Sequence, residues 1–167
     1  MCKNCGALRG FTLIELLVSL TVLTVLSMAA APSFLAAHES LQVTRATEEV
    51  QLFLAMVKSE AVMRNEKVTV YFDTSSPWAL TAKLPDNTEI AKLDGSNFSA
   101  VVMEPTIAGV THLFADPIRG VLTSSAGNSG GLRLYKVNER TAEVKYSRTT
   151  GRIRICSPEK AYGYDKC

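Results

Sequence analysis

The strongest constraint on this chain is a run of 21 residues near its start, Phe11 to Ala31, in which Glu15 is the only charged side chain. At about 1.5 Å rise per residue, a helix of this length spans roughly 31 Å, enough to cross the hydrocarbon core of a bilayer. Lys3 and Arg9 precede the run, so the positive-inside rule places the N-terminus in the cytoplasm and the rest of the chain outside. The sequence therefore predicts one membrane-spanning helix followed by one soluble domain.

Two features of this run leave alternatives open. A cleaved secretory signal has an apolar stretch of roughly 7–15 residues before small residues at its cleavage site. The run here is longer, although a signal-peptidase cut near Ala31 would fit the small residues there. A carboxylate at mid-membrane costs about 2.5–3.5 kcal/mol, and less near the end of a span. Glu15 therefore either reaches the lipid headgroups or finds a cationic partner when the protein assembles.

The first fifteen residues carry a specific motif. A short basic leader ends in Gly10 and is followed by FTLIE, residues 11–15, and then by the apolar helix. This pattern resembles the N-terminus of type IV prepilins and pseudopilins. The resemblance implies that a prepilin peptidase cuts between Gly10 and Phe11 and methylates the new N-terminal residue. It also implies that Glu15 pairs with the N-terminal amine of a neighbouring subunit, which would neutralise a charge that is costly alone.

The same resemblance implies how the chain is organised and where it lies. It divides the chain into a cleaved leader (1–10), a transmembrane and assembly helix (11–37) and a globular domain (38–167) that includes the second half of the helix. The protein would lie in the bacterial inner membrane with its N-terminus in the cytoplasm, and would then join other pilins in the periplasm or outside the cell. A third interpretation is that the chain is an ordinary single-span membrane protein. This interpretation would leave Gly10 and Glu15 unexplained.

The four cysteines fall into two groups. Cys2 and Cys5 form half of a possible zinc site, but no second pair completes it, and both lie in the implied leader. Cys156 and Cys167 lie on the far side of the membrane, where disulfides persist. We expect a Cys156–Cys167 bridge, which would close a loop of about 12 residues and stabilise the C-terminal tail by about 3 kcal/mol.

Beyond the apolar run, helical periodicity continues to about residue 65. Pro32 is expected to kink this helix rather than end it, because apolar residues resume directly after it. Apolar residues at i, i+3, i+4 spacing predict one core face: Ala46, Val50, Phe53, Leu54, Val57 and Ala61. Glu60 and Arg64 are spaced as a favourable i, i+4 ion pair.

After Asn65 the pattern changes to period two. Strand-like segments are predicted at 68–72, 78–84, 89–93, 98–103, 110–114, 132–137, 142–147 and 152–156. Residues 116–120 are typical of a turn, and residues 124–131, SSAGNSGG, of a flexible loop. The pattern predicts an α+β fold with the long helix packed on an antiparallel sheet, which is also the type IV pilin fold that the resemblance implies.

We expect no catalytic site, no metal and no cofactor. His38 and His112 lack a nearby grouping of carboxylate and nucleophile that would suggest a triad. GNSGG, residues 127–131, superficially matches a serine-protease nucleophile loop, but no supporting signature surrounds it. The scattered acidic residues do not follow the spacing of a calcium loop.

Charge is distributed unevenly along the chain. Residues 11–132 hold seven Lys/Arg and twelve Asp/Glu, whereas residues 133–167 hold nine and four. Within the second part, Lys145, Arg148, Arg152 and Arg154 follow one another with no acidic residue between them. Such a cluster is typical of a surface that binds a polyanion, and equally of an exposed face that keeps a strand soluble.

Strand periodicity places some of these cations together. Arg152 and Arg154 are two residues apart, so both side chains leave the same face while Ile153 and Ile155 face the core. Gly151 favours a tight reversal, which would bring Lys145 and Arg148 close to that face. Three aromatic residues near the cluster are candidates for stacking on unpaired bases: Tyr146, Tyr162 and Tyr164.

A second, narrower resemblance covers most of the chain. The helix-plus-sheet layout, FADPIRG (114–120) and GRIR (151–154) resemble the FimT/GspH family of minor pilins and pseudopilins. FimT-type members of naturally competent bacteria bind DNA through a basic C-terminal stretch with a G-R-x-R motif. The resemblance implies that Arg152 and Arg154 bind DNA, with Arg148 and Lys145 as neighbours.

Two functions follow from these patterns. The first is a minor type IV pilin that binds DNA without sequence specificity, through phosphate contacts, for uptake in natural transformation. The alternative is a structural subunit: an H-type pseudopilin of a type II secretion system, or a minor pilin that primes pilus assembly. Four clustered cations favour the first, because a subunit that only packs against others has little need for them.

Overall fold

The structure is a computed structural model that describes residues 11–137 and 140–167, with the side chains of residues 29–37 and 39 left aside. It divides into two compact units, Met1–His38 and Glu39–Cys167. Helix α1 runs from Leu13 to Arg64, continuing through position 32. The predicted leader and Gly10 lie outside the described residues.

In the first unit, the polar side chains of the apolar run bond to the helix itself. The hydroxyl of Ser19 donates to the carbonyl of Glu15 at 2.7 Å, and that of Ser27 donates to the carbonyl of Leu23 at 2.7 Å. Among the described residues, no helix is both long enough and apolar enough to cross a membrane. The span predicted over 11–37 is therefore not confirmed.

In the second unit, the predicted core face of α1 is confirmed. All six residues of the stripe are buried: Ala46, Val50, Phe53, Leu54, Val57 and Ala61. The predicted surface pair is also present, with Arg64 Nε donating to Glu60 Oε2 at 2.7 Å. This part of α1 thus buries one apolar stripe, while its exposed side carries both charged residues and apolar ones such as Leu52 and Met63.

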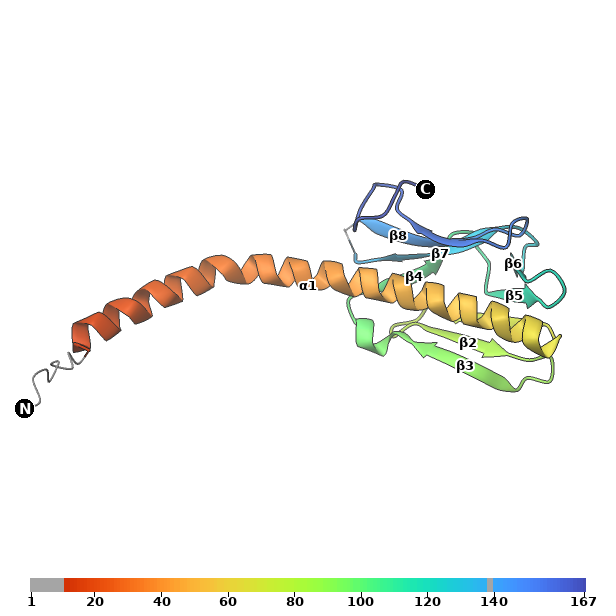
Figure 1. Ribbon diagram of the computed structural model, residues 1–167, viewed down its shortest axis with the longest axis horizontal. Helices are drawn as coiled ribbons and strands as arrows, with labels where there is room; N and C mark the ends of the chain where they lie inside the picture. Colours follow the sequence, from red (N-terminus) through yellow and green to blue (C-terminus); the bar gives the residue numbers. More distant parts are fainter. Residues whose placement is uncertain (1–10, 138–139) are drawn as a thin grey trace, which may run out of the picture. The chain divides into compact units, whose positions relative to one another are not determined.

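In the part of the chain that the structure describes, nine strands form two antiparallel sheets, where the sequence predicted one. The first sheet has the order β3-β2-β1-β5-β6 and consists of β1 (Val68–Asp73), β2 (Ala79–Lys83), β3 (Glu89–Asp94), β5 (His112–Asp116) and β6 (Val121–Ser124). The second has the order β4-β7-β8-β9 and consists of β4 (Val102–Pro105), β7 (Gly130–Tyr135), β8 (Thr141–Tyr146) and β9 (Ile153–Cys156). The C-terminal half of α1 passes along both sheets (Figure 1). The fold is α+β, as predicted.

Two local predictions are wrong. Residues 121–123 were assigned to no element and Ser124 was expected to begin a loop, but they form strand β6, whose four residues are all buried and so show no polar alternation that the sequence could reveal. Phe98 was expected to begin a strand, but it ends a short 3₁₀ helix, η1 (Gly95–Phe98). Its ring stacks on Trp78 with centroids 6.1 Å apart, and this packing decides the local conformation.

The core belongs entirely to the second unit. Its buried residues begin at Val43 and come from α1 and both sheets. Among the described residues, none before Val43 belongs to this core, so we expect the unit from Glu39 onward to fold on its own.

Candidate functional site

The outer face of the second sheet carries charged side chains on three adjacent strands. β8 pairs with β9 so that Lys145 lies opposite Arg154, and with β7 so that Glu143 lies opposite Arg133. The intervening Val144 is fully buried, so the charged side chains leave the opposite, outer face. Lys145 and Arg154 are therefore brought together, as the sequence predicted.

Glu143 is a buried carboxylate at the centre of this face. Its side chain is only 5% exposed, its Oε1 accepts a hydrogen bond from Arg133 Nε at 3.2 Å, and its Oε2 lies 3.2 Å from Lys145 Nζ. A buried charge is tolerated only when it is paired, and Glu143 has two cations. The two cations are in turn held in place while their side chains remain partly exposed.

A groove of about 690 Å³ lies over these residues. We call it the basic groove; it is lined by Thr106, Ile107, Ser129, Gly130, Arg133, Glu143, Lys145, Tyr146, Ser147, Thr150, Arg152 and Arg154. Four cations and one carboxylate face it. Three of the cations were predicted from the sequence, and Arg133 was missed because its place opposite Glu143 depends on strand pairing.

The β8–β9 loop, residues 147–152, positions Arg152 at the edge of this groove. Ser147 N–H donates to the carbonyl of Arg152 at 3.0 Å, and Gly151 N–H donates to the carbonyl of Ser147 at 2.9 Å. Gly151 has φ +66°, as expected for the tight reversal predicted there. Lys58 Nζ of α1 donates to the carbonyl of Gly151 at 2.8 Å, which ties the loop to the helix.

Arg148 does not join the other three predicted cations. Its Nη1 donates to the carbonyl of Gly127 at 2.6 Å, and its backbone N–H donates to Ser129 Oγ at 2.8 Å. It does not line the basic groove but two smaller pockets that it shares with Arg119. The turn directs its side chain away from Arg152, so the predicted cluster of four is divided.

The predicted stacking role of three tyrosines finds no support. Tyr146 is 3% exposed, and burial raises the pKa of its phenol to about 12. Tyr162 donates its hydroxyl to the carbonyl of Arg140 at 2.8 Å, and Tyr164 packs against the core. Neither of these two lines the basic groove. The groove thus offers charge but no exposed aromatic ring from this set.

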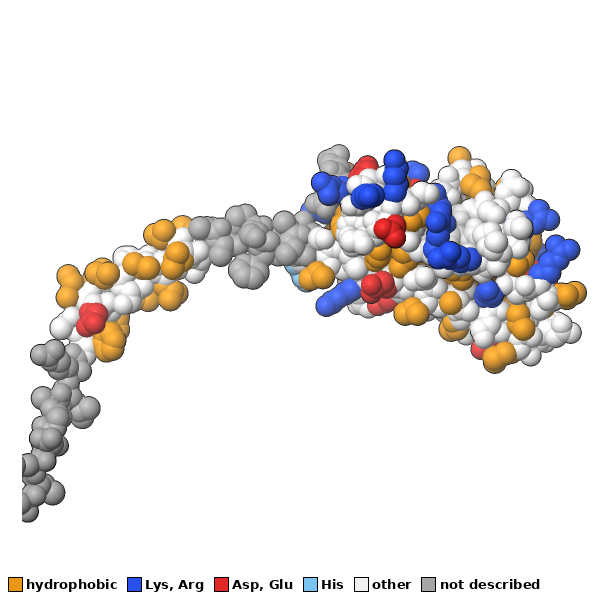
Figure 2. All heavy atoms as spheres, turned by 45° about the horizontal axis from the view of Figure 1, so that its top comes forward, with side chains coloured by type: hydrophobic (Ala, Val, Ile, Leu, Met, Phe, Trp, Pro, Cys, Tyr) orange, Lys and Arg blue, Asp and Glu red, His pale blue; other side chains and the backbone are white. Residues whose placement is uncertain are grey.

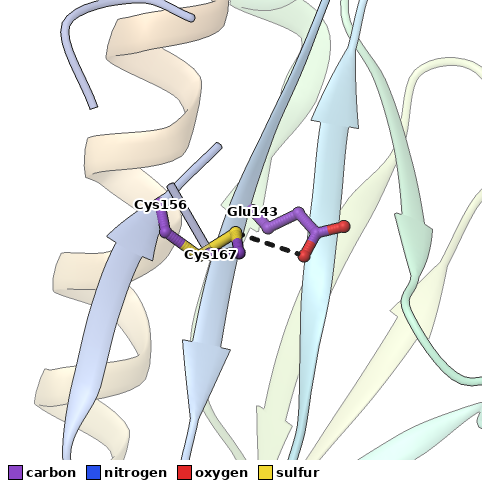
Figure 3. Close-up of side chains that lie close together, drawn as sticks. All are labelled: Glu143, Cys156 and Cys167. Carbon is purple, nitrogen blue, oxygen red and sulfur yellow. Dashed lines mark hydrogen bonds between the residues drawn. A yellow bond between two sulfur atoms is a disulfide. The ribbon is translucent and has the colours of Figure 1, made fainter. Parts of the chain in front are cut away.

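The predicted Cys156–Cys167 disulfide is present and closes the tail beside the basic groove. Cys167 Sγ lies 3.7 Å from Glu143 Oε2 (Figure 3), and Arg154 Nη2 donates to the carbonyl of Cys167 at 3.5 Å. The two sulfurs and Glu143 are close enough to share a metal ion. Both sulfurs are oxidised, however, and the carboxylate already pairs with two cations, so these residues do not fit a metal.

The residues predicted for processing and assembly lie in the first unit. Phe11 is exposed, and Glu15 is exposed in the first turn of α1, where its N–H is 3.3 Å from Thr12 Oγ1. Their predicted roles in cleavage, methylation and subunit pairing remain predictions.

Comparison with known proteins agrees with this architecture. Residues 8–31 match the prokaryotic N-terminal methylation motif, and residues 46–164 match the family of type II transport protein GspH. No curated protein sequence matches the chain.

Solved structures share the fold at low sequence identity. The minor pseudopilin EpsH from the type 2 secretion system of Vibrio cholerae has a TM-score of 0.55 and 13% identity, over 70% of this chain and 98% of EpsH. The type IV minor pilin FimU of Pseudomonas aeruginosa has a TM-score of 0.56 and 18% identity, over 68% of this chain and 87% of FimU. A second crystal form of FimU has a TM-score of 0.53 and 18% identity, over 67% of this chain and 90% of FimU. These likenesses establish the fold.

Proposed function

We propose that this chain is a minor type IV pilin that binds DNA without sequence specificity for uptake in natural transformation. It belongs to the family of type II transport protein GspH, that is, to the minor pilins and pseudopilins. The basic groove is the proposed binding site, with Arg152, Arg154 and Lys145 as phosphate contacts and Arg133 as a fourth. Within the proposal, prepilin peptidase processes the chain at Gly10 and Phe11, the inner membrane holds it, and Glu15 joins it to other pilins.

One observation carries the proposal: four cations line one groove, and Glu143 is the one carboxylate among the lining residues, although Glu104 also lies on this face opposite Arg133. Guanidinium groups bind phosphate oxygens through two parallel N–H donors. Among the described residues, no Asp or Glu side chain forms an ion pair with Arg152 or Arg154, and Arg154 Nη2 donates to the backbone oxygen of Cys167. Such guanidinium contacts are made to the phosphates of the DNA backbone and not to the bases, so binding would not depend on the DNA sequence.

The structural alternative also has an observation in its favour. The likeness to EpsH covers 98% of that pseudopilin, so the whole domain resembles a subunit of a secretion apparatus. In that role the chain would act as an H-type pseudopilin, or as a minor pilin that primes assembly, and the basic groove would contact no nucleic acid.

DNA binding by the isolated domain separates the two. Residues 39–167 with the disulfide intact are titrated with duplex DNA at several salt concentrations and compared with an Arg152→Gln/Arg154→Gln variant. With about three to four phosphate contacts, the log–log dependence of affinity on salt should have a slope of roughly −3, and the variant a slope nearer −1.

A matched control removes the same charge elsewhere. Lys83 and Lys92 lie on β2 and β3, outside every pocket that contains the groove cations, so Lys83→Gln/Lys92→Gln should leave binding nearly unchanged. Absence of binding by the unchanged domain at low salt would reject the DNA function in favour of the structural one. Binding that survives in the arginine variant would place the site elsewhere.

A further inference from the structure

A second group of cations lies on the other side of the β8–β9 loop. Lys67, Arg119 and Arg148 line a pocket of about 320 Å³, and Arg119 and Arg148 line a further pocket with Thr149 and Thr150. We call these three cations the second basic surface. They come from the start of the first sheet, the β5–β6 turn and the β8–β9 loop, which are remote in sequence.

Local hydrogen bonds fix two of these side chains. Asp116 Oδ1 accepts from the backbone N–H groups of Ile118 at 2.8 Å and Arg119 at 3.1 Å, which sets the turn that carries Arg119. Arg148 is bonded at its backbone to Ser129, and its Nη1 uses only a carbonyl, that of Gly127. No other hydrogen bond within the described residues occupies the remaining guanidinium donors of Arg148, so they are available to a ligand.

The charge of the second basic surface is largely uncompensated. Among the described residues, no carboxylate forms an ion pair with Lys67, Arg119 or Arg148. Asp116 also lines the pocket, and its Oδ1 accepts two backbone N–H groups. Lys67 Nζ lies 4.0 Å from the centroid of the Phe114 ring, an interaction that places the ammonium without neutralising it. In the basic groove, by contrast, Glu143 pairs with two of four cations.

The two surfaces meet at the β8–β9 loop. Thr150 lines both the basic groove and the pocket of Arg119 and Arg148. The loop also packs against the β5–β6 turn, since a Cβ on Gly151 would lie 3.1 Å from the carbonyl oxygen of Gly120. Figure 2 shows the Lys and Arg side chains of this face in more than one group. A single extended ligand that crosses the loop at Thr150 would reach both groups.

We propose that Lys67, Arg119 and Arg148 form a second phosphate-binding surface, and that one DNA backbone crosses the β8–β9 loop to contact it and the basic groove together. This inference rests on the proposed function, because the ligand is the same DNA. A single small anion would occupy one surface only, whereas a polymer with a charge at every nucleotide fits two surfaces joined by a short uncharged bridge.

An Arg119→Gln/Arg148→Gln variant of residues 39–167 tests the inference. Binding of duplex DNA should weaken by roughly threefold to fivefold for each lost cation. The slope of log affinity against log salt concentration should become less steep by about two, one for each lost phosphate contact. NMR titration of the unchanged domain should shift the amides of Arg119, Arg148 and Thr149 as well as those of β8 and β9.

Controls separate a binding role from a folding role. Arg119→Lys/Arg148→Lys keeps both charges and should keep the salt slope. The Lys83→Gln/Lys92→Gln variant removes two charges from β2 and β3, the two strands of the first sheet that lie farthest from β6. Melting curves of each variant would test whether the domain remains folded.

The outcomes distinguish this inference from the proposed function. If the unchanged domain binds DNA and only Arg152→Gln/Arg154→Gln weakens it, the proposed function stands and the second surface is rejected. If DNA shifts only the NMR signals of amides in the basic groove, the second basic surface is rejected as well. If the unchanged domain binds no DNA, both proposals fail together.

Discussion

At the residue scale, two leucines of α1 that lie two positions apart illustrate how burial governs stability. Leu54 is fully buried and Leu52 is 68% exposed, although both are leucines on the same helix. We expect Leu54→Ala to lower the free energy of unfolding by about 2–5 kcal/mol, because it leaves a cavity in the core. Leu52→Ala should change it by less than about 0.5 kcal/mol. Urea unfolding followed by circular dichroism measures both, and equal effects would contradict the assigned core face.

Tyr146 gives the domain a stability that depends on alkaline pH. Burial raises the pKa of its phenol to about 12 in the folded protein, against about 10 in the unfolded chain. The folded state therefore holds the proton more tightly, and its stabilisation is complete below pH 10 and is lost as pH rises toward 12. The loss should reach about 2 kcal/mol.

Tyr146→Phe provides the comparison. The difference in unfolding free energy between this variant and the unchanged domain should vary between pH 10 and 12 and stay constant from pH 7 to 9. A difference that is flat across the alkaline range would show that the Tyr146 phenol is not protected.

At the scale of single elements, the β8–β9 loop depends on a glycine. Gly151 has φ +66°, and an added Cβ would lie 3.1 Å from the carbonyl oxygen of Gly120. Gly109 has φ +78° with nothing within 4 Å of an added Cβ. Both Gly→Ala changes should cost about 1 kcal/mol for the left-handed backbone. Gly151→Ala should cost more, because the loop and turn must also separate; similar melting temperatures for the two variants would argue against that packing.

The C-terminal tail is the second element whose stability is testable. Removing the Cys156–Cys167 disulfide by reduction should lower stability by about 3 kcal/mol, since it closes a short loop. This corresponds to a fall in melting temperature on the order of 10 °C. A Cys156→Ala/Cys167→Ala variant should melt at the lower temperature and should not respond to dithiothreitol.

Sequence periodicity predicted some elements well and missed others for physical reasons. The core face of α1 follows a period that alternates buried and exposed positions, so it could be recognised directly. β6 is buried on both faces and carries no such alternation. The division of the strands into two sheets, and the place of Arg133 beside Glu143, follow from pairings between distant segments. The direction of Arg148 depends on hydrogen bonds within a turn that composition does not reveal.

At the scale of the whole molecule, the domain from Glu39 onward should behave as an independent folding unit. Residues 39–167 keep every core residue, whereas residues 49–167 lose Val43 and Ala46, both fully buried. We expect the shorter fragment to be less stable by about 3 kcal/mol, from the lost burial of these side chains. Thermal melts compare the two, and a fragment 49–167 of undiminished stability would show that the first turns of this unit add nothing to the core.

The position of the last residue has a practical consequence. Cys167 is linked to β9, its carbonyl oxygen accepts a hydrogen bond from Arg154, and its sulfur lies beside Glu143. Any tag, dye or surface linker attached after Cys167 would emerge at the rim of the basic groove. A fluorophore there would report on ligands that approach Arg154, while an acidic epitope tag would compete with them. Binding measurements therefore call for attachment on the α1 side, and a comparison of the two attachment points would itself reveal how close the ligand comes to the end of the chain.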